Sequence, residues 1–234
     1  MRRLARLLSD DQRVRAGRLE RSIRSRIPGD LDALARHYGS DKSSEHHGYT
    51  RPYQTHFGKR RLRVRSVLEI GVGGVTSQSG YETAAGGQSL HMWSKYFPRA
   101  RVLGVDIHHK SVSGPRITFE QGDQGDPEFL ARIARNHGPF DIVIDDGSHI
   151  GRHIIASHKH LWEHVKPGGF YVIEDLALAY DARWEGGPPG TPGTAAALLK
   201  ELVDSTLSRE GQDFTPTVAG LHVYAGTAVI EKAG

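Results

Sequence analysis

The segment Asp141–His149, which reads Asp-Ile-Val-Ile-Asp-Asp-Gly-Ser-His, constrains the fold more than any other part of this chain. Its β-branched run Ile142–Ile144 predicts a short strand buried on both faces, as the inner strands of a parallel sheet are. Charged and polar residues begin directly where the run ends. We therefore expect Asp145, Asp146 and His149 at the carboxyl edge of an open α/β sheet, where such folds bind ligands.

Two explanations of this polar cluster are open. An Asp or Ser can cap the helix expected to begin near Ile150, but that explains one residue and not the whole cluster. Two adjacent carboxylates repel each other, so an uncompensated pair raises a pKa or recruits a cation. The sequence has no cysteine, which excludes disulfides, thiolate nucleophiles and Cys-ligated zinc. Any metal would be held by oxygen or imidazole, which favours magnesium or a similar hard ion.

Further apolar runs that end in polar residues predict the other strands of the same sheet. The first of these strands begins at Ser66, and the others cover Arg101–Ile107, Ile117–Asp123 and Phe170–Asp175. A C-terminal hairpin is expected over Leu221–Glu231, with its turn at Ala225-Gly226. Helices are expected over residues 31–38, 89–97, 128–136, 150–164 and 194–207. Alternating strands and helices predict an α/β fold with a mostly parallel sheet and helices on both faces.

The first strand runs into a glycine turn, Gly71-x-Gly73-Gly74. Glycines let a backbone approach a ligand closely, as in nucleotide-binding turns, although they also make ordinary tight turns. The turn alone is a weak signal, and no third glycine stands at the dinucleotide position. Glu69, two residues before the first glycine, suits a cationic or hydroxylated ligand better than a pyrophosphate.

Acids also end the second and third strands. Asp106 is placed to accept hydrogen bonds from both hydroxyls of a ribose. Gly122, Asp123 and Gln124 close the third strand, where an adenine could lie. These positions predict a nucleoside-containing ligand over the glycine turn.

The basic charge of the chain is confined to its beginning. Residues 1–27 hold nine arginines against three acids, a net charge of +6 in a chain of net +4, so the remainder carries about −2. A solvated or subunit-contacting helix is the favoured interpretation of this stretch. Membrane-surface or RNA binding is the weaker one, because the stretch lacks aromatic residues. We expect no nucleic-acid partner and a homo-oligomer.

Other polar features allow plainer interpretations. The segment Tyr38–Tyr53, rich in Tyr and His rings, is either a surface loop or a lid that contacts a cofactor. His153, His158 and His160 are expected on a solvated helix face, since they do not share one face at i, i+4 spacing. No apolar run approaches the roughly 20 residues that span a bilayer, and the Arg-rich start lacks the apolar core of a signal peptide. We expect a soluble, cytoplasmic protein.

Taken in order, these motifs resemble the class I S-adenosylmethionine-dependent methyltransferases. Within that superfamily they look like the magnesium-dependent sugar O-methyltransferases of macrolide and polyketide antibiotic biosynthesis. The matching motifs are Tyr38–Lys42, Leu68–Gly74, Gly104–His108, Gln121–Gln124, Asp145–His149 and Tyr171–Asp175.

The resemblance implies a Rossmann-like sheet, a bound S-adenosylmethionine and a bound Mg²⁺. Asp146 and Asp175 match the metal-binding acids, and His149 matches the general base. The cofactor contacts implied are Glu69, Gly71, Gly73, Asp106, Gly122, Asp123, Gln124 and Asp145.

The resemblance covers about residues 62–234, which we expect to form the methyltransferase domain, after an N-terminal helical extension and cofactor-contacting loop over residues 1–61. Two departures are visible. The stretch between Gly74 and Gly87 is longer than expected, and the large N-terminal domain of longer members is not in the sequence.

The expected activity is methyl transfer from S-adenosylmethionine to a sugar hydroxyl of a glycosylated natural product. Magnesium would lower the pKa of the hydroxyl and neutral His149 would take its proton. The alternatives are O-methylation of a non-sugar diol or catechol, a nicotinamide-dependent dehydrogenase, and a nucleic-acid-binding protein that uses the Arg-rich arm.

Overall fold

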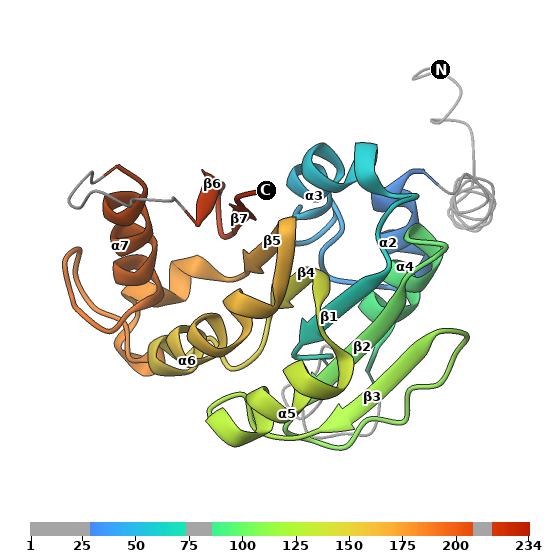
Figure 1. Ribbon diagram of the computed structural model, residues 1–234, viewed down its shortest axis with the longest axis horizontal. Helices are drawn as coiled ribbons and strands as arrows, with labels where there is room; N and C mark the ends of the chain where they lie inside the picture. The colour runs from blue at the N-terminus through green and yellow to red at the C-terminus, as the bar shows by residue number, and fades with distance from the viewer. Residues whose placement is uncertain (1–28, 74–85, 208–216) are drawn as a thin grey trace, which may run out of the picture.

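The computed structural model describes residues 29–73, 86–207 and 217–234. These residues form one seven-stranded sheet in the order β3-β2-β1-β4-β5-β7-β6 (Figure 1). The strands are β1 (Ser66–Ile70), β2 (Arg101–Asp106), β3 (Ile117–Gln121), β4 (Phe140–Asp145), β5 (Val165–Ile173), β6 (Val218–Val223) and β7 (Ala228–Lys232). The Arg-rich stretch 1–27 and most of the glycine-rich stretch after Gly73 lie outside the described residues.

Strands β1 to β5 are mutually parallel, and the C-terminal pair is antiparallel. The strand order reverses between β1 and β4, which pair in the register Val67↔Ile142. A reversal of this kind opens a crevice at the carboxyl ends of the strands, where α/β folds bind ligands. Strand β7 enters the sheet between β5 and β6. The predicted fold class, including the terminal hairpin, is confirmed.

Helices cover both faces of this sheet (Figure 1). The α-helices are α2 (Leu31–Tyr38), α3 (Thr50–Phe57), α4 (Gln88–Tyr96), α5 (Pro127–His137), α6 (Gly151–Leu161) and α7 (Ala195–Leu207). Short 3₁₀ turns cover Gly58–Arg60, Trp162–His164, Leu176–Tyr180 and Ala182–Trp184. Helix α2 begins at the predicted residue and α5 begins one residue before its predicted start, because Asp30 caps α2 and Asp126 caps α5, with Pro127 in its first turn.

The core has two halves, one on each face of the sheet. Helices α5, α6 and α7 pack on one face, and α2, α3 and α4 pack on the other. Tyr53 and Phe57 of α3 contact Trp93 of α4, and all three side chains are fully buried. The described part of the predicted extension, residues 29–61, therefore shares its core with the sheet. Helix α3 is not among the helices that the sequence predicts.

The prediction that His158 lies on a solvated helix face is wrong. His158 is 7% exposed, and its ring stacks on Trp162 and meets Tyr171 edge-on. Its Nε2 atom has no hydrogen-bond partner among the residues that the structure describes. Burial lowers the pKa of His158 to about 4, because a charged imidazolium is poorly solvated there.

This buried histidine predicts acid sensitivity. The folded protein keeps His158 neutral, whereas the unfolded chain binds a proton near pH 6.5. The free energy of unfolding should therefore fall by about 3 kcal/mol through this residue as the pH drops from 6.5 to 4. His158→Phe keeps the aromatic contacts and should remove this loss while staying within about 1 kcal/mol of wild type at pH 7.

Urea unfolding at pH 7 and pH 4.5 measures the effect. Burial also raises the pKa of Asp145 to about 6, and this contributes in the opposite sense over the same range. The quantity to compare is therefore the difference between variant and wild type. His160→Phe on the same helix is the control and should keep the acid sensitivity. An equal loss in wild type and His158→Phe would contradict the prediction.

No helix in the described ranges combines the length and the apolar character needed to cross a bilayer.

Candidate active site

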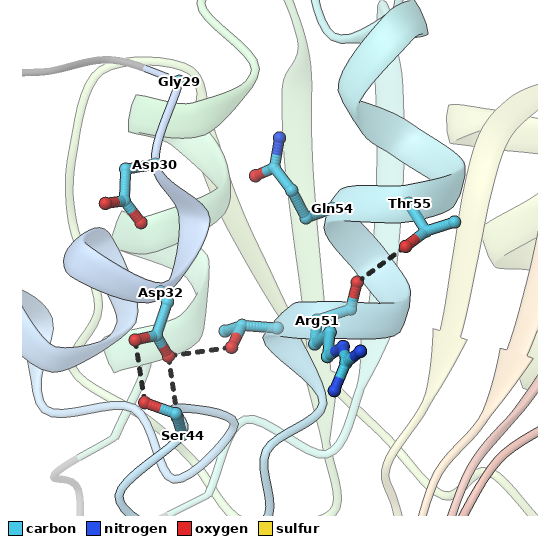
Figure 2. A pocket seen from close by; sticks show the side chains of 8 residues that line it. Gly29, Asp30, Asp32, Ser44, Arg51, Gln54 and Thr55 are labelled. Atoms are coloured by element: carbon cyan, nitrogen blue, oxygen red, sulfur yellow. Dashed lines mark hydrogen bonds between the residues drawn. The ribbon is translucent and has the colours of Figure 1, made fainter.

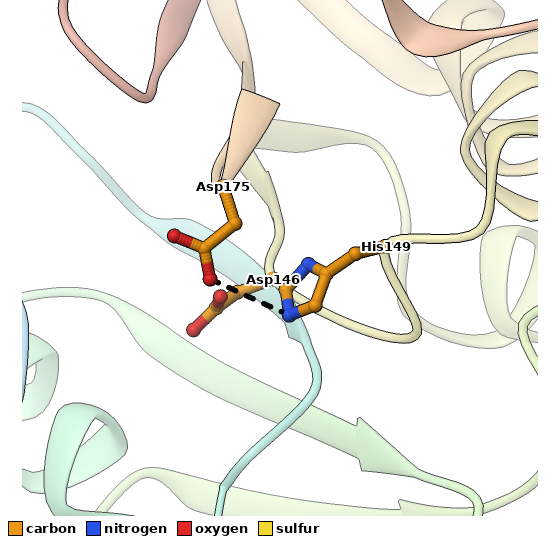
Figure 3. Close-up of side chains that lie close together, drawn as sticks. All are labelled: Asp146, His149 and Asp175. Atoms are coloured by element: carbon orange, nitrogen blue, oxygen red, sulfur yellow. Dashed lines mark ion pairs between the residues drawn. The ribbon is translucent and has the colours of Figure 1, made fainter. Parts of the chain in front are cut away.

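Three predicted site residues meet at the carboxyl ends of β4 and β5. Asp146 follows β4, Asp175 follows β5, and His149 lies on the turn before α6 (Figure 3). Each offers a ligand atom within 4.8 Å of those of the other two, and all three side chains are partly buried. The Nε2 atom of His149 lies 3.5 Å from Oδ2 of Asp175.

The backbone at this site is tightly determined. His149 and Asp175 have left-handed φ angles of 58° and 52°, which non-glycine residues adopt uncommonly. The Asp146 N–H donates to the Ile70 carbonyl at 2.9 Å, and the Glu174 N–H donates to the Asp145 carbonyl at 3.0 Å. These bonds tie the turns after β4 and β5 to their neighbouring strands, so the three side chains are held together rather than carried on free loops.

Asp145 and Gln124 support the β4 turn from inside. The Gln124 amide donates to Asp145 Oδ1 at 2.9 Å, and its oxygen accepts the Ser148 N–H at 2.7 Å. Tyr171 donates to the second Asp145 oxygen at 3.2 Å. Asp145 and Gln124 are buried, at 1% and 6% exposure. The predicted cofactor contacts of Asp145 and Gln124 remain predictions, since their polar side-chain atoms form hydrogen bonds with other residues of the chain.

The three glycines of the predicted cofactor site are in different structural environments. Gly71 has φ 81°, and a Cβ there would lie 2.0 Å from the Asp146 carbonyl oxygen, so glycine is required where the β1 and β4 turns meet. A Cβ on Gly122 would lie 2.1 Å from the Phe129 ring, so this glycine is explained by the packing of α5. A Cβ on Gly73, which has φ 64°, would meet no atom of the described residues within 4 Å.

The acids of the first three strands lie along the same edge. Asp106 accepts the Val72 N–H at 3.1 Å and the His108 N–H at 2.8 Å, and thereby fixes the glycine turn. Asp123 is exposed beyond β3 and accepts the Gly125 N–H at 2.7 Å. Their predicted contacts with the ribose and the adenine remain predictions.

Glu69 is fully buried beneath this edge. Ser89 donates to its Oε2 at 2.7 Å, and the Lys42 ammonium lies 3.5 Å from its Oε1. Burial raises the pKa of Glu69 to about 7. The cation that Glu69 meets in this structure is therefore Lys42, and its assignment to the cofactor remains a prediction.

Sequence reasoning missed the residues that hold the acids from the N-terminal side. Lys42 donates to Asp146 Oδ2 and, at 2.9 Å, to Glu174 Oε2. Tyr49 donates to Asp175 Oδ1 at 2.6 Å, and Tyr53 donates to Glu174 Oε1. Two weak signals were present, since Lys42 closes one of the resembling motifs and both tyrosines lie in the ring-rich segment Tyr38–Tyr53. Neither signal points to these partners, which lie more than 100 residues away in sequence.

Charge explains why Lys42 remains an ammonium ion in this interior. Burial alone would lower the pKa of Lys42, but the carboxylates of Asp146, Glu174 and Glu69 outweigh burial and hold this pKa well above its ordinary value. For Asp146 and Glu174, burial is the largest influence and raises the pKa of each carboxyl. The cluster therefore holds more acids than cations in a poorly solvated place.

Asp32 fixes the segment that carries these side chains, beside a surface hollow between α2 and α3 (Figure 2). Its Oδ1 accepts the Ser44 N–H at 2.7 Å and the Thr50 hydroxyl at 2.8 Å, and its Oδ2 accepts the Ser44 hydroxyl at 2.8 Å. The carboxylate thus sets the chain path between Lys42 and Tyr49. Residues 44–47 of the segment 38–53 are exposed, but Lys42, Tyr49 and Tyr53 are buried, so a surface loop does not describe the whole segment.

Comparison with known proteins points in one direction. No family model matches the sequence. Mycinamicin VI 2''-O-methyltransferase of Micromonospora griseorubida is 45% identical over 222 residues, which are 89% of this chain and 53% of that protein. A tetracenomycin-C rhamnosyl 3'-O-methyltransferase of Streptomyces olivaceus is 42% identical over 225 residues, 92% of this chain and 56% of the relative.

A solved structure agrees. The MycE methyltransferase of the mycinamycin pathway, in complex with Mg, S-adenosylhomocysteine (SAH) and mycinamycin VI, superposes with a TM-score of 0.78 at 45% identity. The match covers 87% of this chain and 53% of MycE. The chain spans about half the length of the curated relatives it matches.

The sheet order, the parallel strands and the terminal hairpin, together with this superposition, define a class I methyltransferase fold. Within that class, the chain is a homologue of the sugar O-methyltransferases that act on macrolide and tetracenomycin glycosides. The resemblance inferred from the motifs is confirmed.

Proposed function

We propose that this chain carries out metal-dependent methyl transfer from S-adenosylmethionine to a sugar hydroxyl of a glycosylated natural product. The observation that carries the proposal is the convergence of Asp146, His149 and Asp175 at the strand ends, in a chain whose relatives are named as sugar O-methyltransferases. Because the chain spans about half of those relatives, its activity, cofactor, metal and acceptor are proposals.

The donor set suits a hard divalent ion. Asp146 and Asp175 supply carboxylate oxygens, which Mg²⁺ prefers in proteins, and their ligand atoms lie within 4.8 Å of each other and of His149. When bound, such an ion lowers the pKa of a hydroxyl that it coordinates. S-adenosylmethionine fits the edge formed by β1 and β2, where Asp106 is partly exposed and no atom of the described residues would lie within 4 Å of a Cβ on Gly73.

The roles of the protein groups follow from their positions. His149 takes the proton of the sugar hydroxyl on a ring nitrogen, while the hydroxyl oxygen forms a bond to the methyl carbon and the carbon–sulfur bond breaks. The products are a methyl ether and SAH. Asp175, 3.5 Å from His149 Nε2, stabilises the imidazolium that forms. Tyr49 orients Asp175 through its 2.6 Å hydrogen bond.

The test is methyl transfer from labelled S-adenosylmethionine to a rhamnosylated or macrolide glycoside, with the methyl ether detected by mass spectrometry. Magnesium should support turnover, and exhaustive treatment with EDTA should abolish it until magnesium is restored. Full activity after EDTA would mean that Asp146 and Asp175 have structural roles only. A parallel assay with a catechol as the acceptor tests the alternative. If only the catechol were methylated, the acceptor would be a catechol and not a sugar.

The comparisons lend no support to the dehydrogenase or nucleic-acid alternatives, because the relatives reported above are methyltransferases. The predicted oligomer remains a proposal, and size-exclusion chromatography with light scattering tests it.

A further inference from the structure

Lys42 has no role in the proposed reaction, yet it lies at the centre of the acid cluster. Its side chain is 1% exposed. Besides its bonds to Asp146 and Glu174, its Nζ atom lies 3.5 Å from Glu69 Oε1. These three acids lie on β1 or directly after β4 and β5. One buried ammonium group therefore joins the carboxyl ends of three adjacent strands at the centre of the sheet.

The acids around Lys42 need a positive charge. Tyr53 donates to Glu174 and Ser89 donates to Glu69, but these hydroxyls are neutral and cannot offset the repulsion between carboxylates. A buried carboxylate that loses its cationic partner is strongly destabilising. The ammonium group of Lys42 supplies that charge at the point where the carboxylates approach one another.

We propose that Lys42 is the resident counter-cation of the acid cluster and positions Asp146 and Glu174 in the protein before any metal binds. A consequence, which rests on the proposed metal site, concerns the coupling of metal to stability. Lys42 and a divalent ion compensate the same carboxylates. With Lys42 present, folding should depend little on metal. Without it, a divalent ion is what remains to offset the acids, and folding should become metal-dependent.

The first test is a double-mutant cycle in EDTA with Lys42→Met, Asp146→Asn and the double variant, followed by thermal unfolding. Lys42→Met should lower the Tm by about 10 °C, as expected when one partner of a buried ion pair is removed. Adding Asp146→Asn should restore more than half of that loss, because the carboxylate closest to the missing ammonium group, and its repulsion with Glu174 and Glu69, are then gone. Additive effects would overturn the proposal.

A matched control lies at the other end of β4. Lys166 pairs with Asp141 at 3.0 Å, and both side chains are partly exposed. Lys166→Met should shift the Tm by no more than about 4 °C, and Asp146→Asn should give no rescue in that background. If Lys42→Met is insoluble while the double variant folds, the result equals rescue. If neither folds, charge compensation at Asp146 is not the role of Lys42 and the proposal fails.

The second test repeats the melts in millimolar MgCl₂. Where magnesium raises the Tm of either protein, the gain should be larger for Lys42→Met than for wild type, and an equal or smaller gain in Lys42→Met would then overturn the counter-cation role. This arm also separates the two proposals. If magnesium shifts no variant, the metal site of the proposed function fails, and the cycle in EDTA still decides whether Lys42 compensates the acids.

Discussion

Replacing His149 by alanine is expected to cut the rate of methyl transfer by about 10²–10⁴-fold, the usual contribution of a general base. The affinity for S-adenosylmethionine should stay near wild type, because His149 is not among the predicted cofactor contacts. Single-turnover rates and calorimetry with the cofactor measure the two effects.

The left-handed backbone of His149 requires a second variant. Its φ of 58° is strained for alanine but tolerated by asparagine, which cannot act as the base. His149→Asn should therefore be as slow as His149→Ala. His160→Ala on α6 is the control and should be as fast as wild type. Near-normal turnover in His149→Asn would remove this residue from proton transfer and leave metal activation alone.

The fold could be predicted because its signals are local. Each inner strand is a short apolar run, such as Ile142–Ile144, and each ends where polar residues begin. Caps are local as well, as Asp30 and Asp126 show. Helix α3 escaped prediction because the sequence Thr-Arg-Pro-Tyr-Gln-Thr-His-Phe is mostly polar and has a proline at its third position, and its burial comes from packing against α4.

The site could be predicted only in part, for the same reason. Asp146, His149 and Asp175 follow strands that are adjacent in a parallel sheet, so topology brings them together. Lys42 and Tyr49 reach those acids through a segment without regular period, and no spacing rule connects positions more than 100 residues apart. Spacing also misled for His158, whose neighbours Trp162 and Tyr171 enclose it.

Gly71 and Gln124 show a different limit. Both are positions where a ligand contact and a structural role predict the same residue type. In the structure, Gly71 permits the approach of two turns, and Gln124 joins Asp145 to the Ser148 N–H. A sequence motif indicates that a position requires a particular residue type. Only the neighbouring residues in the structure show whether the fold or a ligand imposes that requirement. The same constraint serves the site, since both residues hold the turn on which Asp146 and His149 lie.

Asp175→Asn is expected to slow methyl transfer about as much as the His149 variants do, because it weakens metal binding. Asparagine tolerates the φ of 52° at this position, and its amide oxygen can still accept the Tyr49 hydrogen bond, so the fold should persist. The negative charge is lost, and magnesium affinity should fall by about 10²-fold or more. The rate should fall by about 10³-fold, since a bound ion contributes several kcal/mol to the transition state. Calorimetry with MgCl₂ and single-turnover rates measure the two effects.

Raising the magnesium concentration separates the roles of Asp175. If the aspartate serves only to hold the ion, saturating magnesium should restore most of the rate of Asp175→Asn. A rate that stays low at saturation would mean that the carboxylate also acts on His149, which lies 3.5 Å away. Asp181→Asn is the matched control, because Asp181 caps the next 3₁₀ turn and pairs with Arg183. Magnesium affinity and rate both unchanged in Asp175→Asn would exclude Asp175 as a ligand.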